Sequence, residues 1–396
     1  MKAYIVDGVR TPIGRYNGAL SHIRPDDLAA KAIASLAARH SEIPSDHYEE
    51  VVLGAANQSG EDNRNVARMA LLLSGLDHSI PAVTVNRLCG SGADAIAYGM
   101  RSIKARDNDL VIVGGVESMS RAPYVMGKAE TVLSREQRLY DTTLGWRFIN
   151  KALEATYGCD TMGETAENVA ADYNVTRQEQ DLFALSSQEK AAKAIANGRF
   201  NLEIGVELED RSGNPIEVDE HPRATTLEKL AKLKPAFRDG GSVTAGNSSG
   251  INDGAVAILL ASEVAVERYG LTPIAEVVSC ATAGVEPRTM GIGPLYATKR
   301  LLERQEISIN QIDLIEINEA FASQVIASLR GLGIDPHSDI VNRNGGAIAL
   351  GHPLGMSGAR LALTLSHEMR KTDANLGVAT MCIGVGQGIS LLLRKP

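Results

Sequence analysis

The sequence has few aromatic side chains and few cysteines. Its 396 residues include five Phe, ten Tyr and one Trp, and its four cysteines are too far apart for a disulfide framework or a zinc knuckle. It has no apolar run near the roughly 18 residues of a membrane span, and a charged residue at position 7 comes before any signal-peptide apolar segment. These absences predict free thiols in a cytoplasmic protein that has no membrane partner.

The charge and the apolar content narrow the class of protein further. The formal net charge of −8 at pH 7 argues against general nucleic-acid binding. Hydrophobic residues make up 44% of the chain and 38 residues are glycine, so the interior must consist of aliphatic side chains and closely packed backbone. Because the chain exceeds the size at which one core usually stops growing, we expect an α/β enzyme with more than one structural unit.

Strand-like and helix-like segments alternate in both parts of the chain. Apolar residues 3–7 precede a helical pattern over 26–38, and residues 83–85 precede one over 92–104. The same alternation resumes after Asp253. It predicts layered α/β units with a parallel or mixed sheet.

A repeated tripeptide indicates an internal duplication. Ser91-Gly92-Ala93 precedes Asp109-Leu110 by 18 residues, and Ser357-Gly358-Ala359 precedes Asn375-Leu376 by the same 18 residues. Each tripeptide also follows a Val-Asn step and a glycine-rich loop. We therefore expect two similar halves.

The segment between the two alternating regions is polar and too long for an ordinary connection. We expect residues 1–120, completed by 251–270, to form one half and residues 271–396 the other. Residues 121–250 would then be an inserted loop domain.

Two helix starts are predicted inside the insert. Thr165 is expected to cap a helix over 166–173, and Thr176 with Glu179 fits a capping box for a helix over 177–197.

Cys89 lies between a β-rich run and a glycine-rich helix start. A lone cysteine is usually an inert buried thiol, but packing does not require the glycines on both sides of Ser91, whereas exposure of a side chain at a tight turn does. Unpaired N–H groups and the helix dipole would lower the pKa of a thiol at this position. We expect a nucleophile that is reactive at neutral pH.

Two later glycine-rich segments carry further reactive groups. His352 is followed by a proline and is flanked by glycines, which suits a base beside a thiol, although an isolated histidine often only caps a turn. Cys382 ends an apolar strand and precedes the glycine series 384–388. Zinc binding by Cys89, His352 and Cys382 is less favoured because no paired ligand spacing occurs. The glycine series does not open a long helix, as a dinucleotide site would require.

Asn318 and the segment 241–254 have two interpretations each. Asn318 follows the apolar residues 313–317 and is either a helix cap or an amide that orients a water or a carbonyl oxygen. The glycine-rich and hydroxyl-rich segment 241–254 is either a plain loop or a site for a narrow polar ligand or phosphates.

Together these segments resemble the thiolase family over the whole chain. The motifs, in order, are NRLCGSG (86–92), VESMSRAP (116–123), VTAGNSSGINDGA (243–255), NEAFA (318–322), NGGAIALGHPLGMSGAR (344–360) and CIGVGQG (382–388). The resemblance implies the thiolase fold, in which two similar mixed-sheet α/β halves stack in five layers (αβαβα) around an inserted loop domain. It also implies a homotetramer that uses coenzyme A or acetyl-CoA as co-substrate, with no permanently bound cofactor and no metal.

The resemblance also implies a role for each reactive group. Cys89 would be acylated, His352 would take its proton, and Cys382 would protonate the departing acetyl-CoA enolate or abstract the α-proton in the synthetic direction. One oxyanion site would be His352 with a water held by Asn318. The other would be formed by the backbone N–H groups of Cys89 and Gly384.

Coenzyme A would be held by residues of the insert and by one later phenylalanine. The family pattern matches Leu153, Met162, Phe237, Ala245, Ser249 and Phe321. Pro222 stands where a nucleotide-facing arginine is common, with Arg223 adjacent. Thr161 stands where many acetoacetyl-CoA thiolases have a pocket histidine.

Four further segments narrow the range of expected substrates. They resemble bacterial 3-oxoadipyl-CoA thiolases and relatives described as acetyl-CoA acetyltransferases. These segments are residues 60–70, 120–129, 140–150 and 219–237. Arg121, Lys128 or Arg147 would receive a distal carboxylate, or would be solvated charges or tetramer contacts. Acetoacetyl-CoA, other 3-ketoacyl-CoA thioesters and 3-oxoadipyl-CoA all stay open as substrates, as does the direction of the reaction.

The sequence leaves two alternatives to a thiolase. A ketoacyl synthase-type condensing enzyme relies on other partners in place of the Cys382 motif. A non-catalytic acyl-CoA-binding protein would be expected to have lost a reactive group, whereas this sequence has all three.

Overall fold

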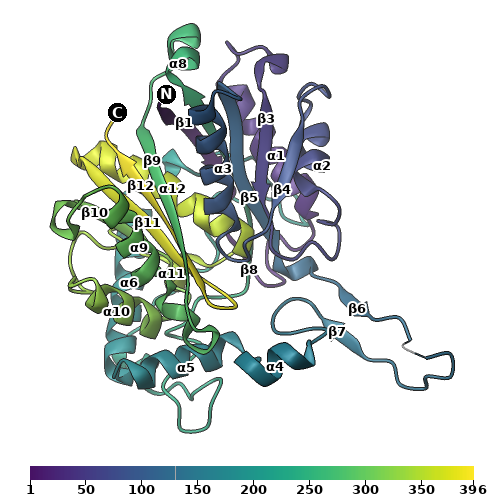
Figure 1. Cartoon of the computed structure of the whole chain (residues 1–396), viewed down its shortest axis with the longest axis vertical. Helices are drawn as coiled ribbons and strands as arrows, with labels where there is room; N and C mark the ends of the chain where they lie inside the picture. The colour runs from purple at the N-terminus through teal and green to yellow at the C-terminus, as the bar shows by residue number, and fades with distance from the viewer. Residues whose placement is uncertain (130) are drawn as a thin grey trace.

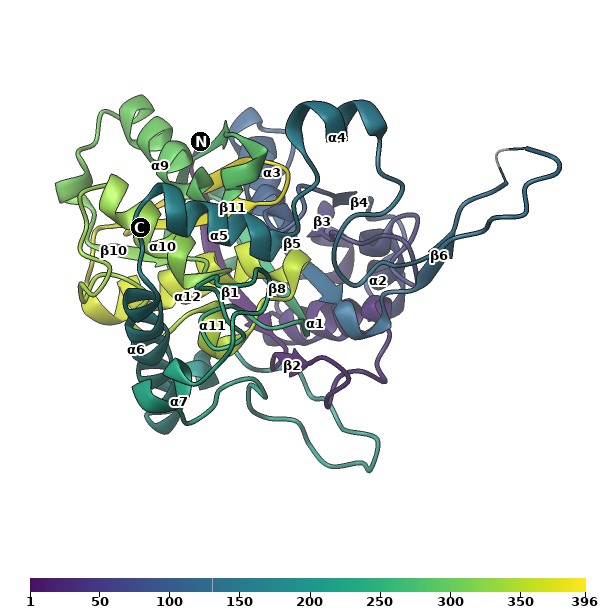
Figure 2. The ribbon, with the colours of Figure 1, turned by 90° about the horizontal axis from the view of Figure 1, so that it is seen from below.

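The computed structural model describes residues 1–129 and 131–396 (Figures 1 and 2). Its main sheet has the strand order β10-β11-β12-β9-β1-β8-β5-β3-β4, and β2 pairs with β8. The strands are β1 (Ala3–Arg10), β2 (Gly14–Arg15), β3 (Glu50–Gly54), β4 (Ala82–Val85), β5 (Leu110–Ser118), β8 (Asn252–Ser262), β9 (Ala275–Gly284), β10 (Leu314–Ile317), β11 (Leu376–Ile383) and β12 (Gln387–Arg394).

Each half of the chain contributes a mixed half-sheet. In the first, β3 runs parallel to β4 and β5, and β8 is antiparallel to β5 and β1. In the second, β10 and β11 are parallel, and β12 is antiparallel to both β11 and β9. The half-sheets are joined between β1 and β9 by two residue pairs, Tyr4 with Glu276 and Ile5 with Ala275.

Helices separate and cover the two half-sheets, which gives five layers. One outer layer packs on the first half-sheet, a middle pair lies between the half-sheets, and the other outer layer packs on the second half-sheet. These helices are α1 (Pro25–Arg39) and α2 (Val66–Ser74), then α3 (Ser91–Ala105) and α12 (Leu354–Thr372), then α9 (Gly293–Arg304) and α10 (Ala322–Gly331). The predicted αβαβα arrangement is confirmed.

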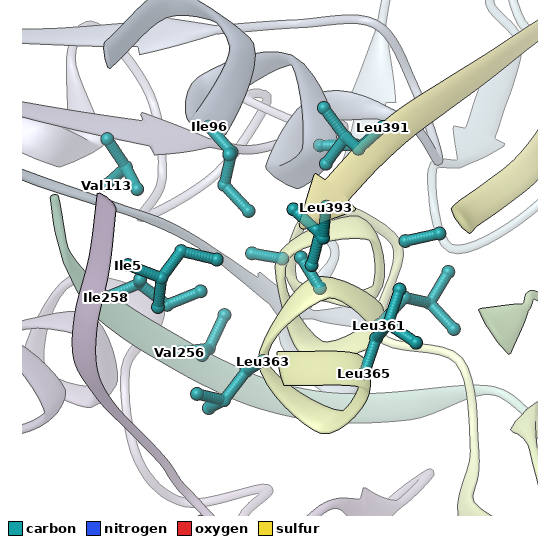
Figure 3. Close-up of a cluster of buried hydrophobic side chains, with 14 of the residues drawn as sticks. Ile5, Ile96, Val113, Val256, Ile258, Leu361, Leu363, Leu365, Leu391 and Leu393 are labelled. Atoms are coloured by element: carbon teal, nitrogen blue, oxygen red, sulfur yellow. The ribbon is translucent and has the colours of Figure 1, made fainter. Parts of the chain in front are cut away.

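Aliphatic side chains fill the middle layer, as the low aromatic content predicts. Alternate residues of β5 face opposite layers, so that Val113 joins the middle core while Ile112 packs under the outer helices. Figure 3 shows Ile96 and Val113 of the first half in one cluster with Leu361 of α12 and Leu391 of β12. Both half-sheets therefore share one central core.

The repeated tripeptides explain how closely the two middle helices approach. A Cβ on Gly92 would lie 2.6 Å from the carbonyl oxygen of Gly355 and 2.8 Å from the amide nitrogen of Ala359. A Cβ on Gly358 would lie 2.5 Å from the amide nitrogen of Ala93. Each glycine thus admits the backbone of the other copy of the motif, and the two copies meet at the interface between the halves.

The segment between β5 and β8 contains a hairpin and four helices. The hairpin strands β6 (Tyr124–Met126) and β7 (Leu139–Asp141) project from the body (Figures 1 and 2). The helices are α4 (Lys151–Tyr157), α5 (Met162–Asp172), α6 (Arg177–Ala196) and α7 (Leu227–Ala231), and the remaining short helices of the chain are α8 (Glu263–Tyr269) and α11 (Ala347–Leu350).

One predicted helix start in this segment is confirmed and the other is wrong. The capping box of Thr176 and Glu179 opens α6. Helix α5 begins at Met162 rather than at residue 166, because the hydroxyl of Thr161 caps it by accepting the N–H of Glu164. Thr165 lies inside the helix, where its hydroxyl donates to the carbonyl of Met162 at 2.7 Å.

A buried ion network ties the insert to the first strand. Arg10 is fully buried at the end of β1; its Nε lies 3.0 Å from a Glu203 carboxylate oxygen, and its Nη1 and Nη2 lie 2.7 and 2.9 Å from the two oxygens of Asp219. Arg199 reaches the other oxygen of Glu203 at 2.8 Å.

Within the described residues, no helix is long and apolar enough to cross a membrane.

Candidate active site

A cavity of about 390 Å³ opens onto Cys89. Its walls come from the end of β4, the end of β5, the segment 142–147, the start of α5 and the turn after β11. The lining residues are Ala56, Asn57, Leu88, Cys89, Glu117, Met119, Thr142, Thr143, Leu144, Gly145, Trp146, Arg147, Thr161, Met162, Leu354, Gly384 and Val385.

Cys89 lies in a strained turn between β4 and α3. Leu88 just before it has φ = 47°, a left-handed conformation that is unusual for a residue other than glycine. The turn packs closely on β3, since a Cβ on Gly54 would lie 2.3 Å from the carbonyl carbon of Ser91. The strand-to-helix placement of the thiol agrees with the sequence interpretation.

The predicted lowering of the Cys89 pKa is wrong. Burial raises the pKa of this thiol to about 11, although the backbone N–H of Gly384 and its own N–H point at the sulfur and oppose the rise. The next two N–H groups do not help, because Gly90 donates to the carbonyl of Arg87 and Ser91 to that of Leu88, both at 3.0 Å. The group at rest is therefore a thiol, and a base must take its proton before it can attack.

His352 is a buried neutral imidazole. It stands two residues before the first residue of α12, and its backbone N–H donates to Asn252 Oδ1 at 2.9 Å. Burial and the nearby Arg360 guanidinium lower its pKa to about 3. A ring that is uncharged at neutral pH can accept a proton.

The hydrogen bonds around His352 define its tautomer. Nδ1 lies 2.7 Å from the hydroxyl of Ser357, and that hydroxyl donates its one proton to the carbonyl of Pro353 at 2.7 Å. Nδ1 must therefore carry the ring proton. The lone pair is on Nε2, which lies 3.3 Å from Asn318 Nδ2.

Asn318 has a free acceptor beside the imidazole. It follows β10, is fully buried, and donates its backbone N–H to the carbonyl of Thr380 at 3.0 Å. Its Oδ1 has no hydrogen-bond partner among the described residues. A buried amide with an open oxygen at this point is able to hold a water or orient a polar group of a ligand. The helix-cap interpretation is wrong, since α10 begins four residues later at Ala322.

Cys382 is a second buried thiol near the first. It lies near the end of β11 and packs with Met162, Phe321 and Met290. Burial raises its pKa, and the charge of an ionised Cys89 would raise it further. This thiol stays protonated at neutral pH and can act as a proton donor.

The turn after Cys382 completes the wall opposite the thiol. Gly384 directs its N–H at Cys89 Sγ, and Val385 has φ = 62°, a strained conformation for a β-branched residue. Both residues line the cavity. The N–H groups of Cys89 and Gly384 thus both point at Cys89 Sγ, and N–H groups that converge in this way are able to stabilise negative charge.

The sequence interpretation missed Glu117, which lines the cavity from the end of β5. Its carboxylate accepts backbone N–H groups from Ala56 at 2.9 Å, Asn57 at 3.1 Å and Gly355 at 2.8 Å. Burial raises its pKa to about 7. The signal was present, because Glu117 is the one charged residue in the otherwise uncharged segment 110–118.

The predicted coenzyme A residues lie partly together. Met162 lines the cavity and packs with Phe321, whose ring meets that of Phe237 edge-on at 6.1 Å between centroids. The remaining predicted residues do not line the cavity around Cys89. Ser249 donates its N–H to the carbonyl of Ala320, Arg223 donates to the carbonyl of Ala245, and Leu153 lies half-buried on α4.

Residues 1–129 and 131–396 contain no group of three or more His, Cys, Asp and Glu side chains that is arranged to hold a metal ion.

Comparisons with known proteins agree with this geometry. The family model for the thiolase N-terminal domain matches residues 3–264, and that for the thiolase C-terminal domain matches residues 271–395. The chain is 55% identical to the 3-oxoadipyl-CoA/3-oxo-5,6-dehydrosuberyl-CoA thiolase of Escherichia coli, over 100% of this chain and 99% of that protein. It is 56% identical to the beta-ketoadipyl-CoA thiolase of Pseudomonas aeruginosa, with the same coverage.

A solved structure shares the whole fold. The acetyl-CoA acetyltransferase of Bacillus anthracis superposes with a TM-score of 0.92 at 38% identity, covering 100% of this chain and 99% of that one. Both domain models and relatives that are more than half identical thus span the chain from end to end. The protein belongs to the thiolase family, and is accordingly an acyltransferase.

Proposed function

We propose that this thiolase cleaves 3-oxoadipyl-CoA with coenzyme A to give acetyl-CoA and succinyl-CoA. The observation that carries the proposal is the thiol of Cys89 at the cavity, with the N–H groups of Cys89 and Gly384 directed at its sulfur and a second buried thiol, Cys382, close to it. The choice of substrate is supported by the two relatives named for 3-oxoadipyl-CoA and beta-ketoadipyl-CoA.

In the first half-reaction, Cys89 gives its proton to Nε2 of His352 and its sulfur attacks the C3 carbonyl. The N–H groups of Cys89 and Gly384 are suited to stabilise one oxyanion, and His352 with a water on Asn318 the other. The C2–C3 bond then breaks and leaves a succinyl thioester on Cys89. The electron pair forms the enolate of acetyl-CoA, which takes a proton from Cys382.

In the second half-reaction, coenzyme A resolves the thioester. Its thiol gives a proton to the Cys382 thiolate and attacks the acyl carbon, and the imidazolium of His352 returns the first proton to the departing Cys89 sulfur. Succinyl-CoA leaves and the free enzyme is restored. Cys89 regains its own proton from His352, and Cys382 replaces the proton lost to acetyl-CoA with the one from the coenzyme A thiol, so two thiols and one imidazole suffice.

The coenzyme A moiety would lie against the insert. We assign this role to Leu153, Met162, Arg223, Phe237, Ala245, Ser249 and Phe321. The T-shaped pair of Phe237 and Phe321 offers an apolar surface for the pantetheine arm, and Phe237 is 40% exposed.

The test compares coenzyme A-dependent cleavage of 3-oxoadipyl-CoA and acetoacetyl-CoA by the wild-type chain. A kcat/KM that is at least tenfold higher for the diacid is expected. Acetoacetyl-CoA is the second candidate substrate, and Thr161 at the cavity wall, in place of a histidine, weighs against it. A preference for acetoacetyl-CoA would make the protein a general acetyltransferase, and no cleavage of either substrate would leave an acyl-CoA-binding protein.

We propose further that the insert, residues 121–250, assembles four copies of the chain. Tyr124 and Met126 on the projecting hairpin are 67% and 60% exposed, which suits burial against a second copy. Light scattering should give a tetramer for the wild type and a smaller species for the double variant Tyr124→Lys, Met126→Glu. The variant Val264→Lys, at an exposed site on α8, is the matched control. A tetrameric hairpin variant would refute this assembly.

A further inference from the structure

Two of the side chains that line the cavity around Cys89 carry a charge, Glu117 and Arg147. Arg147 is therefore the basic group of the cavity, as far as the described residues are concerned. Any substrate whose C3 carbonyl reaches Cys89 must place the chain beyond that carbonyl in the same space. A cation at this wall is a candidate partner for an anionic substrate tail.

The segment that carries Arg147 is fixed at both of its ends. At its start, Asn57 Nδ2 donates to the carbonyl and the hydroxyl oxygen of Thr142, both at 3.1 Å, and that hydroxyl donates to the carbonyl of Pro123 at 2.6 Å. Next to Arg147, the indole N–H of Trp146 donates to the carbonyl of Asp160 at 3.1 Å. Arg147 thus lies on a loop that hydrogen bonds of Thr142 and Trp146 anchor to the rest of the protein.

The other two basic residues named from the sequence are placed differently. Arg121 is held by Glu61 at 2.5 and 2.6 Å and lines another cavity. Lys128 is exposed just after hairpin strand β6 and does not line the cavity around Cys89. Among residues 1–129 and 131–396, Arg147 is half-buried at the cavity wall and forms no ion pair such as that of Arg121, so its guanidinium is available to a ligand.

The acidic side chain in the same cavity does not compete for Arg147. Both oxygens of Glu117 already accept backbone N–H groups, from Ala56, Asn57 and Gly355. A substrate carboxylate buried without a partner would lose much of its binding energy, whereas a guanidinium fork binds a carboxylate with two charge-assisted hydrogen bonds.

We propose that Arg147 binds the terminal carboxylate of a 3-oxo dicarboxylic acyl-CoA and thereby determines the preference of this enzyme for diacid substrates. This inference rests on the proposed function and adds the residue that would select the substrate. Arg147 does not take part in bond making or breaking. It fixes the distal end of the chain while the C3 carbonyl lies at Cys89.

The experiment measures kcat/KM for 3-oxoadipyl-CoA, for its terminal methyl ester and for acetoacetyl-CoA, in the wild type and in Arg147→Met, Arg147→Lys and Lys128→Met. The ratio of diacid to methyl ester should fall about 10- to 100-fold in Arg147→Met, the loss expected for hydrogen bonds to a charged group. Arg147→Lys should recover part of the ratio, because it keeps the charge but not the fork. Lys128→Met, the matched control on the hairpin, should keep the wild-type ratio.

Binding of adipyl-CoA, which has no 3-oxo group and cannot be cleaved, gives a readout without turnover. Calorimetry should show an affinity loss of the same size in Arg147→Met, and no such loss for hexanoyl-CoA. An equal fall for all three substrates in Arg147→Met would overturn the inference by showing a structural role. A wild type that cleaves the diacid and its ester equally well would also overturn it and leave the proposed function intact. A wild type that does not cleave the diacid would overturn the proposed function itself.

Discussion

At the scale of single residues, the reactive proton of the resting candidate site is on the sulfur of Cys89. Burial raises the pKa of Cys89 to about 11 and lowers that of His352 to about 3, so at neutral pH the first is a thiol and the second a neutral imidazole. A thiolate–imidazolium pair would need the opposite shifts. Substrate binding must therefore promote the transfer, and the free enzyme should be less nucleophilic than a pre-ionised thiol.

Alkylation of Cys89 by iodoacetamide should rise about tenfold for each pH unit between pH 7 and pH 10, with no plateau. Below its pKa, a thiol ionises in proportion to the hydroxide concentration. The measurement is the rate of modification of the Cys89 peptide by mass spectrometry. A plateau already reached at pH 7 would contradict the raised pKa.

Ser357→Ala should lower kcat about tenfold with little change in KM, because the Nδ1 proton of His352 loses its partner and the ring loses its fixed tautomer. Ser366→Ala is a close control, since that buried hydroxyl on the same helix also donates to the carbonyl four residues earlier, at 2.7 Å, but has no histidine partner. Equal kcat values in the two variants would show that Ser357 does not position the imidazole. Thermal unfolding of both variants separates this effect from a loss of stability.

At the scale of elements, the strand-to-helix turn and the middle helices hold the site together. The contact of α3 with α12 depends on Gly92 and Gly358, each facing backbone of the other helix. Helix α12 begins three residues before Ser357, whereas α3 begins at Ser91 itself. The two copies of the motif therefore share the contact but not the point at which the helix begins, and Leu354, the first residue of α12, lines the cavity around Cys89.

Gly358→Ala should lower the free energy of unfolding by about 1–3 kcal/mol, since the new methyl group would meet the backbone of Ala93 at 2.5 Å and the helices must shift. Activity should fall as well, because the same shift displaces α12, which His352 precedes, relative to α3, which Cys89 precedes. Gly284→Ala is the control: its Cβ would meet nothing closer than 4.0 Å. Chemical denaturation measures the free energy of unfolding of the two variants. Equal values would refute a tight contact between the helices.

The elements also show what sequence patterns can and cannot predict. Strands such as β1, β3 and β5, the capping box of α6 and the positions of Cys89 and His352 at turns follow from local residue patterns. The start of α5 was misplaced because Thr161 and Thr165 are both able to cap a helix, and the choice depends on tertiary packing. The sign of the Cys89 pKa shift and the roles of Glu117 and Ser357 depend on burial and on partners far away in the chain, which no local pattern contains.

At the scale of the whole molecule, buried charge attaches the insert to the core. Arg10 on β1 neutralises Glu203 and Asp219 of the insert in the interior. Burial raises the pKa of Glu203, but Arg199 and Arg10 outweigh it and hold the pKa at about 2. The ionised Glu203 thus contributes stability that is complete above its unfolded pKa of 4.5 and is lost as the pH falls towards 2.

Arg10→Met should lower the free energy of unfolding at pH 7 by about 3–5 kcal/mol, because it leaves buried carboxylates without a counter-charge. The difference from the wild type should shrink as the pH falls from 7 to 4, since protonation removes the unpaired charge in the variant. Arg39→Met, which removes a partly exposed partner of Asp7, should cost less than about 1 kcal/mol. A pH-independent difference between wild type and Arg10→Met would contradict this account.

The thiol and its base come from different copies of the repeated unit. Cys89 precedes α3 in the first half and His352 precedes α12 in the second, each by two residues. Neither half alone carries both partners of the proposed proton transfer. A change that disturbs the contact between α3 and α12 therefore acts on the proposed reaction as well as on stability, so the middle helices should tolerate as little change as the reactive groups that precede them.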